Sequence, residues 1–267
     1  PGMLYGRILR SPHAHANIRS VDTTRAEALP GVFAVATSAD FPIISEQALD
    51  PAAGGARMMA ENDLAHKKAL YKGHAVAAVA AVSAHLAEEA SALISVDYEP
   101  LQPVLSVHDA MKEGAPVLHE GLTTQLKADR SGPGEDTGAA GNVASHIQME
   151  RGDIDAGFEE ATLVIEREFA TQTVHQGYIE PFASTAYWAP DGHITVWTST
   201  QGAFGIRSAT AAIVGIPESM VKVVPMEVGG AFGGKGIGYL DPVAAVLSKK
   251  SGRPVKMVMS RQEVFEA

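Results

Sequence analysis

The sequence has 267 residues, which is long enough for two domains, and 21 basic against 31 acidic residues give it a net charge of −10. This acidic balance argues against unspecific binding to nucleic acid. The chain contains no cysteine, which excludes disulfides, zinc fingers, iron–sulfur clusters bound by this chain and thiol nucleophiles.

The first residues lack the charged and apolar regions of a signal peptide, and the apolar run 75–82 is too short to span a bilayer. We therefore predict a cytoplasmic protein. The sequence begins at Pro1 rather than at a methionine, which is consistent with a fragment or a processed piece.

Short strand-like and helix-like segments alternate over the first hundred residues, a pattern typical of a mixed α/β layer. Ser83 is a good N-cap for the helix that follows it. Residues 42–64 contain Pro51 and Gly54-Gly55 and are predicted to form a long loop. The expected strands are 4–9, 32–36, 75–82 and 96–98, and the expected helices are 25–29 and a longer one after Ser83.

Residues 121–143 are rich in small and polar side chains and lack the periodicity of a core-forming element, which indicates a linker. The predicted organisation is an α/β domain over 1–120, a polar Gly/Pro linker over 121–147, and a second α/β domain that starts at 148 and continues to 267.

The second part is expected to alternate strands and helices as well. Asp191-Gly192 between two strand signals predicts a hairpin, and Asp241 is predicted as the N-cap of a helix with Pro242 at its first position. The expected strands are 162–169, 184–188, 193–198, 221–228 and 255–259, and the expected helices are 203–214, ended by Gly215, and 241–250, followed by Gly252.

The loop from Gly229 to Gly236 is the densest glycine stretch of the chain and lies between a predicted strand and a predicted helix. Its backbone can come close to a ligand, and consecutive free N–H groups attract anions. The loop matches a phosphate-binding P-loop as far as Lys235, but Gly236 occupies the position of the hydroxyl that should bind magnesium. A P-loop-like nucleotide site and a purely structural turn both remain open at this point.

Three other positions carry side chains suited to chemistry. His13 and His15 could share a face and ligate a metal, although no third ligand is in view and a structural role is favoured. Glu180, in an apolar neighbourhood, is either a base with a raised pKa or a hydrogen-bonded structural carboxylate. Gln201 follows a strand, and its amide can donate to a ligand oxygen.

Taken together, the motifs resemble the molybdenum-binding large subunit of the xanthine dehydrogenase, aldehyde oxidase and carbon monoxide dehydrogenase family. The matching stretches are LYGRILRSPHAHANI, LPGVFAV, YKGHAVAAVAA, AEEA and VDYEPL in the first part, and HQGYIEP, TSTQGAF, VGGAFGGK and SGRPVKMVMSR in the second. The resemblance covers almost the whole chain. It implies an α/β hammerhead domain followed by the beginning of a molybdopterin-binding domain.

The resemblance implies that Gln201 and Phe232 are the residues nearest the chemistry. Gln201 matches a glutamine that hydrogen-bonds an oxygen ligand of molybdenum. The implied cofactor is molybdopterin, in its cytosine dinucleotide form, and its dithiolene holds the metal, so that no protein side chain is a metal ligand. The implied cofactor-binding residues are Gln201, Gly229, Gly230, Ala231, Phe232, Gly233 and Gly234.

The implied activity is that of an oxidoreductase that hydroxylates an aldehyde, an N-heterocycle or a similar carbon centre with water-derived oxygen. Electrons would leave through iron–sulfur and FAD subunits or domains, which a cysteine-free chain must find in its partners. No nucleic-acid or membrane partner is expected. Many purine and aldehyde enzymes of the family have a glutamate just after the Gly-Lys of this loop, whereas here Lys235 is followed by Gly236 and Ile237, which argues against a purine substrate.

The family's catalytic glutamate and later pterin-binding loops would lie beyond Ala267, so the chain alone is expected to be incomplete and inactive. The alternative from another class is a non-catalytic scaffold or assembly fragment of such a complex.

Overall fold

The computed structural model describes residues 1–42, 54–129 and 134–267. These residues form two compact units, one of Pro1–Leu101 together with His175–Ala267 and one of Gln102–Val174. The first unit thus combines both ends of the chain. Because this grouping reflects contacts rather than chain order, the domain limits at 120 and 148 stay a prediction.

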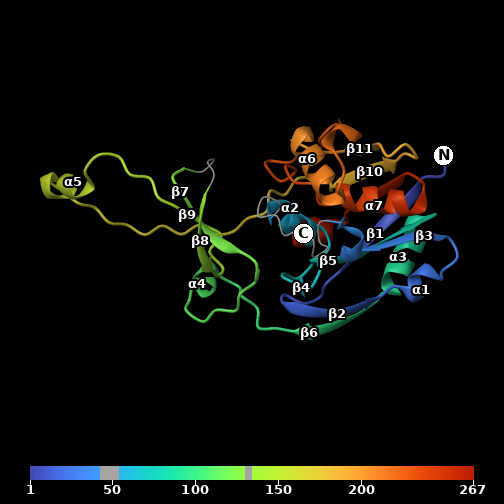
Figure 1. Ribbon diagram of the computed structural model, residues 1–267, viewed down its shortest axis with the longest axis horizontal. Helices are drawn as coiled ribbons and strands as arrows, with labels where there is room; N and C mark the ends of the chain where they lie inside the picture. Colours follow the sequence, from blue (N-terminus) through green and yellow to red (C-terminus); the bar gives the residue numbers. More distant parts are fainter. Residues whose placement is uncertain (43–53, 130–133) are drawn as a thin grey trace. The chain divides into compact units, whose positions relative to one another are not determined.

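The first unit contains most of the regular structure (Figure 1). Its strands are β1 (Leu4–Arg10), β2 (Ala16–Asp22), β3 (Val32–Thr37), β4 (Lys68–Ala69), β5 (Ala75–Ala81), β6 (Ser95–Pro100), β10 (Ala183–Trp188), β11 (Ile194–Thr198), β12 (Val221–Pro225) and β13 (Val255–Val258). Its helices are α1 (Thr24–Glu27), α2 (Gly54–Asp63), α3 (Ala84–Ala92), α6 (Ala203–Val214), α7 (Asp241–Ser251) and α8 (Arg261–Glu266), with 3-10 turns η1 (Ser38–Asp40) and η4 (Glu218–Met220).

One seven-stranded sheet, in the order β12-β11-β10-β13-β1-β5-β3, forms the centre of this unit. β1 and β13 pair in parallel, with Leu4 opposite Val255, so the two ends of the chain share a sheet. β11 and β12 are also parallel, whereas the other neighbours are antiparallel. A second sheet has the order β4-β2-β6. The mixed α/β fold predicted from the sequence is confirmed.

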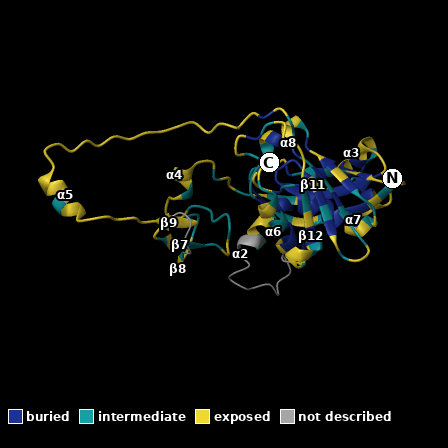
Figure 2. Cartoon of the chain, turned by 90° about the horizontal axis from the view of Figure 1, so that it is seen from above, coloured by how far each residue is buried: buried dark blue, intermediate teal, exposed yellow. Residues whose placement is uncertain are grey.

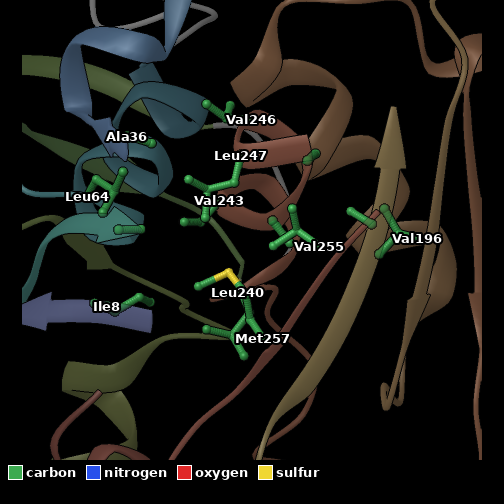
Figure 3. Packing of buried hydrophobic residues seen from close by; sticks show 14 of the residues in the cluster. Ile8, Ala36, Leu64, Val196, Leu240, Val243, Val246, Leu247, Val255 and Met257 are labelled. Carbon is green, nitrogen blue, oxygen red and sulfur yellow. The ribbon is translucent and has the colours of Figure 1, made fainter. Parts of the chain in front are cut away.

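The core lies where α7 packs on the large sheet. α7 is buried over most of its length, and Val243 and Leu247 have no exposed surface. Figure 3 shows Val243, Val246 and Leu247 of α7 beside Val255 of β13. β5 is buried at every position, as its continuous apolar sequence predicts.

Several local signals act as predicted. The Ser83 hydroxyl accepts a hydrogen bond from the Leu86 N–H and caps α3. α6 ends at Gly215 and α7 at Gly252, both with left-handed backbone at φ 71° and φ 66°. β10 and β11 form the predicted hairpin across Asp191-Gly192.

The second unit is small and polar. It contains α4 (Val107–Ala110), α5 (Ile154–Glu160) and a sheet of β8 (Glu135–Ala140), β7 (Thr123–Lys127) and β9 (Ser145–Ile147). The Thr124 hydroxyl donates to the Val143 carbonyl oxygen at 2.7 Å, and the Thr137 hydroxyl donates to the Thr124 carbonyl oxygen at 2.9 Å. Polar contacts therefore hold this sheet together. β7 and β8 lie within the stretch 121–147 that was predicted to be a linker. Most of this sheet and of α5 is exposed or half-buried (Figure 2).

Two predicted segments are wrong. Residues 162–169 form no strand, and the side chains of Leu163, Val164 and Ile165 are exposed, because the described part of the chain offers them no neighbouring strand. The predicted loop 42–64 contains α2, whose Ala60 is buried, together with the buried Leu64 just after it. Residues 43–53 of that loop lie outside the described residues.

Asp241 is not an N-cap. Leu240 occupies that position, and Asp241 is the first helical residue. Its carboxylate is turned into the core, where it accepts a hydrogen bond of 2.7 Å from the Ser184 hydroxyl. None of the helices in the described ranges is long and apolar enough to cross a membrane.

We predict that Asp63→Asn stabilises the protein at neutral pH. Burial, and to a lesser extent the Asp241 carboxylate, raises the pKa of Asp63 well above its usual value. Between the unfolded pKa and the folded pKa of Asp63, the folded state therefore holds a proton that the unfolded state has lost. This contribution to stability is full below the unfolded pKa of about 4 and is lost as the pH rises through the folded pKa.

Urea unfolding from pH 4 to pH 8 measures the effect. The free energy of unfolding should fall less steeply with rising pH in Asp63→Asn than in the wild type. Tyr71 and Tyr239 do not interfere, because burial raises the pKa of both, that of Tyr71 to about 12. Asp97→Asn, at an exposed position of β6, is the control and should leave the slope unchanged. Equal slopes in all three proteins would contradict the prediction.

Candidate functional site

The candidate site lies at one edge of the large sheet, where three loop segments meet because of the strand order. β11 and β12 run in parallel and are joined by α6, so their carboxyl ends lie at the same edge. β10 is antiparallel to β11, which brings its amino end to that edge too. The segments are 175–182 before β10, 199–202 after β11 and 226–236 after β12. Ligands bind preferentially at such carboxyl edges.

A single carboxylate oxygen joins the three segments. Oε2 of Glu180 accepts hydrogen bonds from the ammonium of Lys235 at 2.6 Å, from the Ser199 hydroxyl at 2.7 Å and from the Gly229 N–H at 2.7 Å. The Glu180 N–H donates back to the Gly229 carbonyl oxygen at 3.2 Å. Glu180 therefore fixes the start of the glycine loop as well as its end.

Lys235 is the buried partner of this ion pair. Its side chain has no exposed surface, whereas that of Glu180 is 33% exposed. The ammonium also donates to the Ser199 hydroxyl at 3.1 Å and lies 5.1 Å from the centre of the Tyr178 ring. Because this ammonium is directed into the fold, it cannot reach a nucleotide phosphate in the manner of a P-loop lysine. The structure therefore argues against a P-loop-like nucleotide site.

Glu180 is a structural carboxylate and not a base with a raised pKa. Burial acts to raise its pKa, but the hydrogen bonds from Lys235, Ser199 and the Gly229 N–H outweigh burial and hold the pKa below its usual value. Glu180 is consequently ionised at neutral pH. Of the two alternatives open in the sequence, the structure selects the hydrogen-bonded one.

Gln201 is exposed and is held through its backbone and its side chain. Its N–H donates to the Lys235 carbonyl oxygen at 2.9 Å, and its Oε1 accepts from the Lys235 N–H at 3.2 Å. Only the oxygen of the amide can accept from an N–H, so the NH₂ group is the free end. Within the described residues this NH₂ group donates to no protein atom.

Glycine is needed in the loop for two different reasons, space and backbone conformation. A Cβ at Gly229 would lie 2.7 Å from the Glu180 Cβ, and one at Gly234 would lie 2.7 Å from the Tyr178 ring, so both positions need glycine for space. Gly230 and Gly233 have left-handed backbone, with φ 96° and φ 92°. Ala231 is buried, and its carbonyl oxygen accepts from the Gly234 N–H at 2.9 Å.

Phe232 is strained and exposed. Its φ of 51° is the only positive value of a non-glycine residue in the described part of the chain. Its side chain is 75% exposed, so packing does not explain why a large residue occupies this conformation. Backbone strain of this kind clusters at ligand-binding sites.

The structure therefore brings together the residues predicted to bind a cofactor, namely Gln201, Gly229, Gly230, Ala231, Phe232, Gly233 and Gly234, at one edge. Their roles stay predictions. His15 is buried, and His13 packs edge-on against Tyr98 of β6, a strand of the second sheet. The described residues contain no cluster of three or more His, Asp or Glu side chains that could hold a metal.

Sequence reasoning did not pair Glu180 with Lys235. The available signal was that Glu180 is the one acidic residue of the stretch 175–182 and Lys235 the one charged residue of the glycine-rich stretch 228–238. Charges in such surroundings are paired when they are buried.

A βαβ crossover with a glycine loop, an exposed amide and a strained aromatic residue at its carboxyl edge defines a cofactor-binding α/β protein. Comparison with known families agrees with this class. Residues 136–267 match the molybdopterin cofactor-binding domain, and residues 1–102 match the a/b hammerhead domain of aldehyde oxidase and xanthine dehydrogenase.

Individual proteins show the same similarity. The carbon monoxide dehydrogenase large chain of Afipia carboxidovorans is 35% identical over 98% of this chain and 32% of its own length. A probable xanthine dehydrogenase subunit of Bacillus subtilis is 34% identical, again over 98% of this chain and 32% of its own. The crystal structure of quinoline 2-oxidoreductase from Pseudomonas putida 86 superposes with a TM-score of 0.77 and 30% identity over 99% of this chain and 32% of that one.

The chain belongs to the aldehyde oxidase and xanthine dehydrogenase family of molybdopterin-binding proteins. It spans about a third of the length of these relatives.

We predict that Phe232→Gly raises the free energy of unfolding. Left-handed backbone costs a residue with a Cβ roughly 1–2 kcal/mol, and glycine avoids most of this cost. Phe232→Ala is the matched control, because it removes the ring and keeps the Cβ. Thermal unfolding should show a higher melting temperature for the glycine variant than for the alanine variant. Equal melting temperatures would mean that the backbone at this position carries no strain.

Proposed function

We propose that this chain forms the amino-terminal part of the molybdenum-cofactor-binding subunit of a molybdenum hydroxylase. The single observation that carries the proposal is the free NH₂ group of Gln201, held beside the glycine loop by the Lys235 backbone. Such a donor suits an oxygen-bearing group of the cofactor. When bound, the cofactor would supply two-electron oxidation of a carbon centre with oxygen derived from water.

The residues at this edge fit a molybdopterin. The protein offers donors and open backbone: a Cβ at Gly202, Gly205 or Gly233 would meet no atom within 4 Å, so ligand atoms have room there. Because the dithiolene of the pterin would hold the metal, a protein without cysteine is compatible with the site. Gln201 would orient the cofactor, Gly229, Gly230, Ala231, Gly233 and Gly234 would line it, and the exposed Phe232 ring would exclude water beside it.

The finer parts of the proposal follow from the relatives' names and the resemblance of the motifs. We propose the cytosine dinucleotide form of the cofactor, a cytoplasmic location, and electron transfer to iron–sulfur and FAD subunits or domains. The substrate class is an aldehyde, an N-heterocycle or a similar carbon centre, in keeping with relatives named for quinoline and for carbon monoxide. The remainder of the molybdenum subunit completes the site.

Metal and pterin analysis tests the proposal. The full polypeptide that carries this sequence, purified with its partners, should contain molybdenum, release an oxidised fluorescent pterin, and yield cytidine monophosphate on acid hydrolysis. Absence of molybdenum and pterin from that complex would refute the proposed molybdenum hydroxylase and favour a non-catalytic scaffold. The chain of 267 residues by itself should retain little molybdenum.

We predict that Gln201→Glu lowers the turnover of the loaded enzyme about 10²–10³-fold, the cost of removing one preorganised donor. The glutamate keeps an oxygen for the Lys235 N–H but has no NH₂ group for the cofactor. Gln172→Glu makes the same chemical change at an exposed position of the second unit and is the control. Steady-state rates measured at equal molybdenum content provide the comparison. A rate within twofold of the wild type would show that Gln201 is not the orienting donor.

A further inference from the structure

We infer that Lys235 is a positioning residue, which acts through its buried ion pair with Glu180 to fix the side chain of Gln201 with its NH₂ group toward the ligand. This inference rests on the proposed function of the site. It adds to that function a part of the fold, the buried side chain of Lys235 and its partner Glu180, that sets the chemical class of the atom facing Gln201.

The contact between the two residues is reciprocal. Lys235 accepts the Gln201 N–H on its carbonyl oxygen and donates its own N–H to Gln201 Oε1. The Thr200 hydroxyl donates to the same carbonyl oxygen at 3.1 Å and accepts from the Gly202 N–H at 3.0 Å. Thr200 and Gln201 are therefore both aligned on the backbone of Lys235.

The orientation of the Gln201 amide follows from this contact. A rotation of the amide by 180° would set its NH₂ group against the Lys235 N–H, two donors facing each other, and would lose the hydrogen bond. The oxygen thus stays inside and the NH₂ group stays outside. The site consequently selects a hydrogen-bond acceptor at that position of the ligand, and it disfavours a group whose only polar atom is a donor.

The backbone of Lys235 needs to be held in place, because the glycines on both sides of it allow many backbone conformations. Gly233, Gly234 and Gly236 flank it, and Gly233 already has left-handed backbone. The anchor is the side chain. An ammonium with no exposed surface is stable only with its partners in place, and here these are Glu180 Oε2 and Ser199 Oγ.

Lys235→Met tests the inference, because it keeps the length of the side chain and removes the charge. Hydrogen exchange, resolved to single residues by mass spectrometry on the full polypeptide, reports the two amides of the reciprocal contact, those of residues 201 and 235. We expect both to exchange about tenfold faster or more, while the amides of β5, which lies in the core, keep their wild-type rates.

The β5 amides separate positioning from a merely structural role. If Lys235 only stabilised the fold, exchange would accelerate throughout the first unit or not at all, and either result would overturn the inference. Lys256→Met, an exposed lysine of β13, is the control and should leave the amides of residues 201 and 235 unchanged. Should Lys235→Met fail to fold, Ser199→Ala removes one bond from the ammonium and is read by the same criterion.

The exchange experiment is independent of the proposed function. It needs no molybdenum, so a complex without the cofactor would refute the hydroxylase while leaving the coupling of Lys235 to Gln201 measurable. In a loaded enzyme, Lys235→Met should also lower turnover more than it raises the Michaelis constant. The reason is that a misoriented donor weakens contacts to the reacting centre more than it weakens contacts to the substrate.

Discussion

The ion pair between Glu180 and Lys235 is the interaction on which the candidate site depends. Three segments far apart in the sequence contact each other through it. Breaking a buried pair by removing one partner typically costs about 3–5 kcal/mol, which is comparable to the total stability of a marginal domain. The exposure of Glu180 at 33% reduces this cost but does not remove it, because Lys235 is fully buried.

The pair works because the fold brings the right strand ends together. The connection from β11 through α6 to the parallel strand β12 sets residues 199–202 beside residues 226–236, and the hairpin with β10 adds Glu180. The same sheet joins β1 to β13, so the first residues of the chain support the site without contributing to it. Sheet order, and not proximity in sequence, therefore determines which side chains can meet.

Local signals in the sequence were sufficient to predict the elements whose ends or burial are marked by particular residues. Helix α6 with Gly215, helix α3 with Ser83, and the buried strand β5 were predictable from the sequence alone. Residues 162–169 were not, because their apolar run Leu163-Val164-Ile165 needs a neighbouring strand that the described chain does not supply. The motifs located Gln201 and the glycine loop. The pairing of Glu180 with Lys235 is a long-range contact over 55 residues, and no local pattern encodes it.

The number of donors at this edge limits what the chain can do. A hydrogen bond contributes about 1 kcal/mol net, whereas micromolar affinity requires about 8 kcal/mol. The NH₂ group of Gln201 by itself falls short of that value, and the exposed ring of Phe232 adds contact on one side only. Under the proposed function, this surface would orient a cofactor that the remainder of the molybdenum subunit holds. The strain at Phe232 and the buried charge of Lys235 make sense in these terms, because an orienting surface gains more from rigidity than from additional contacts.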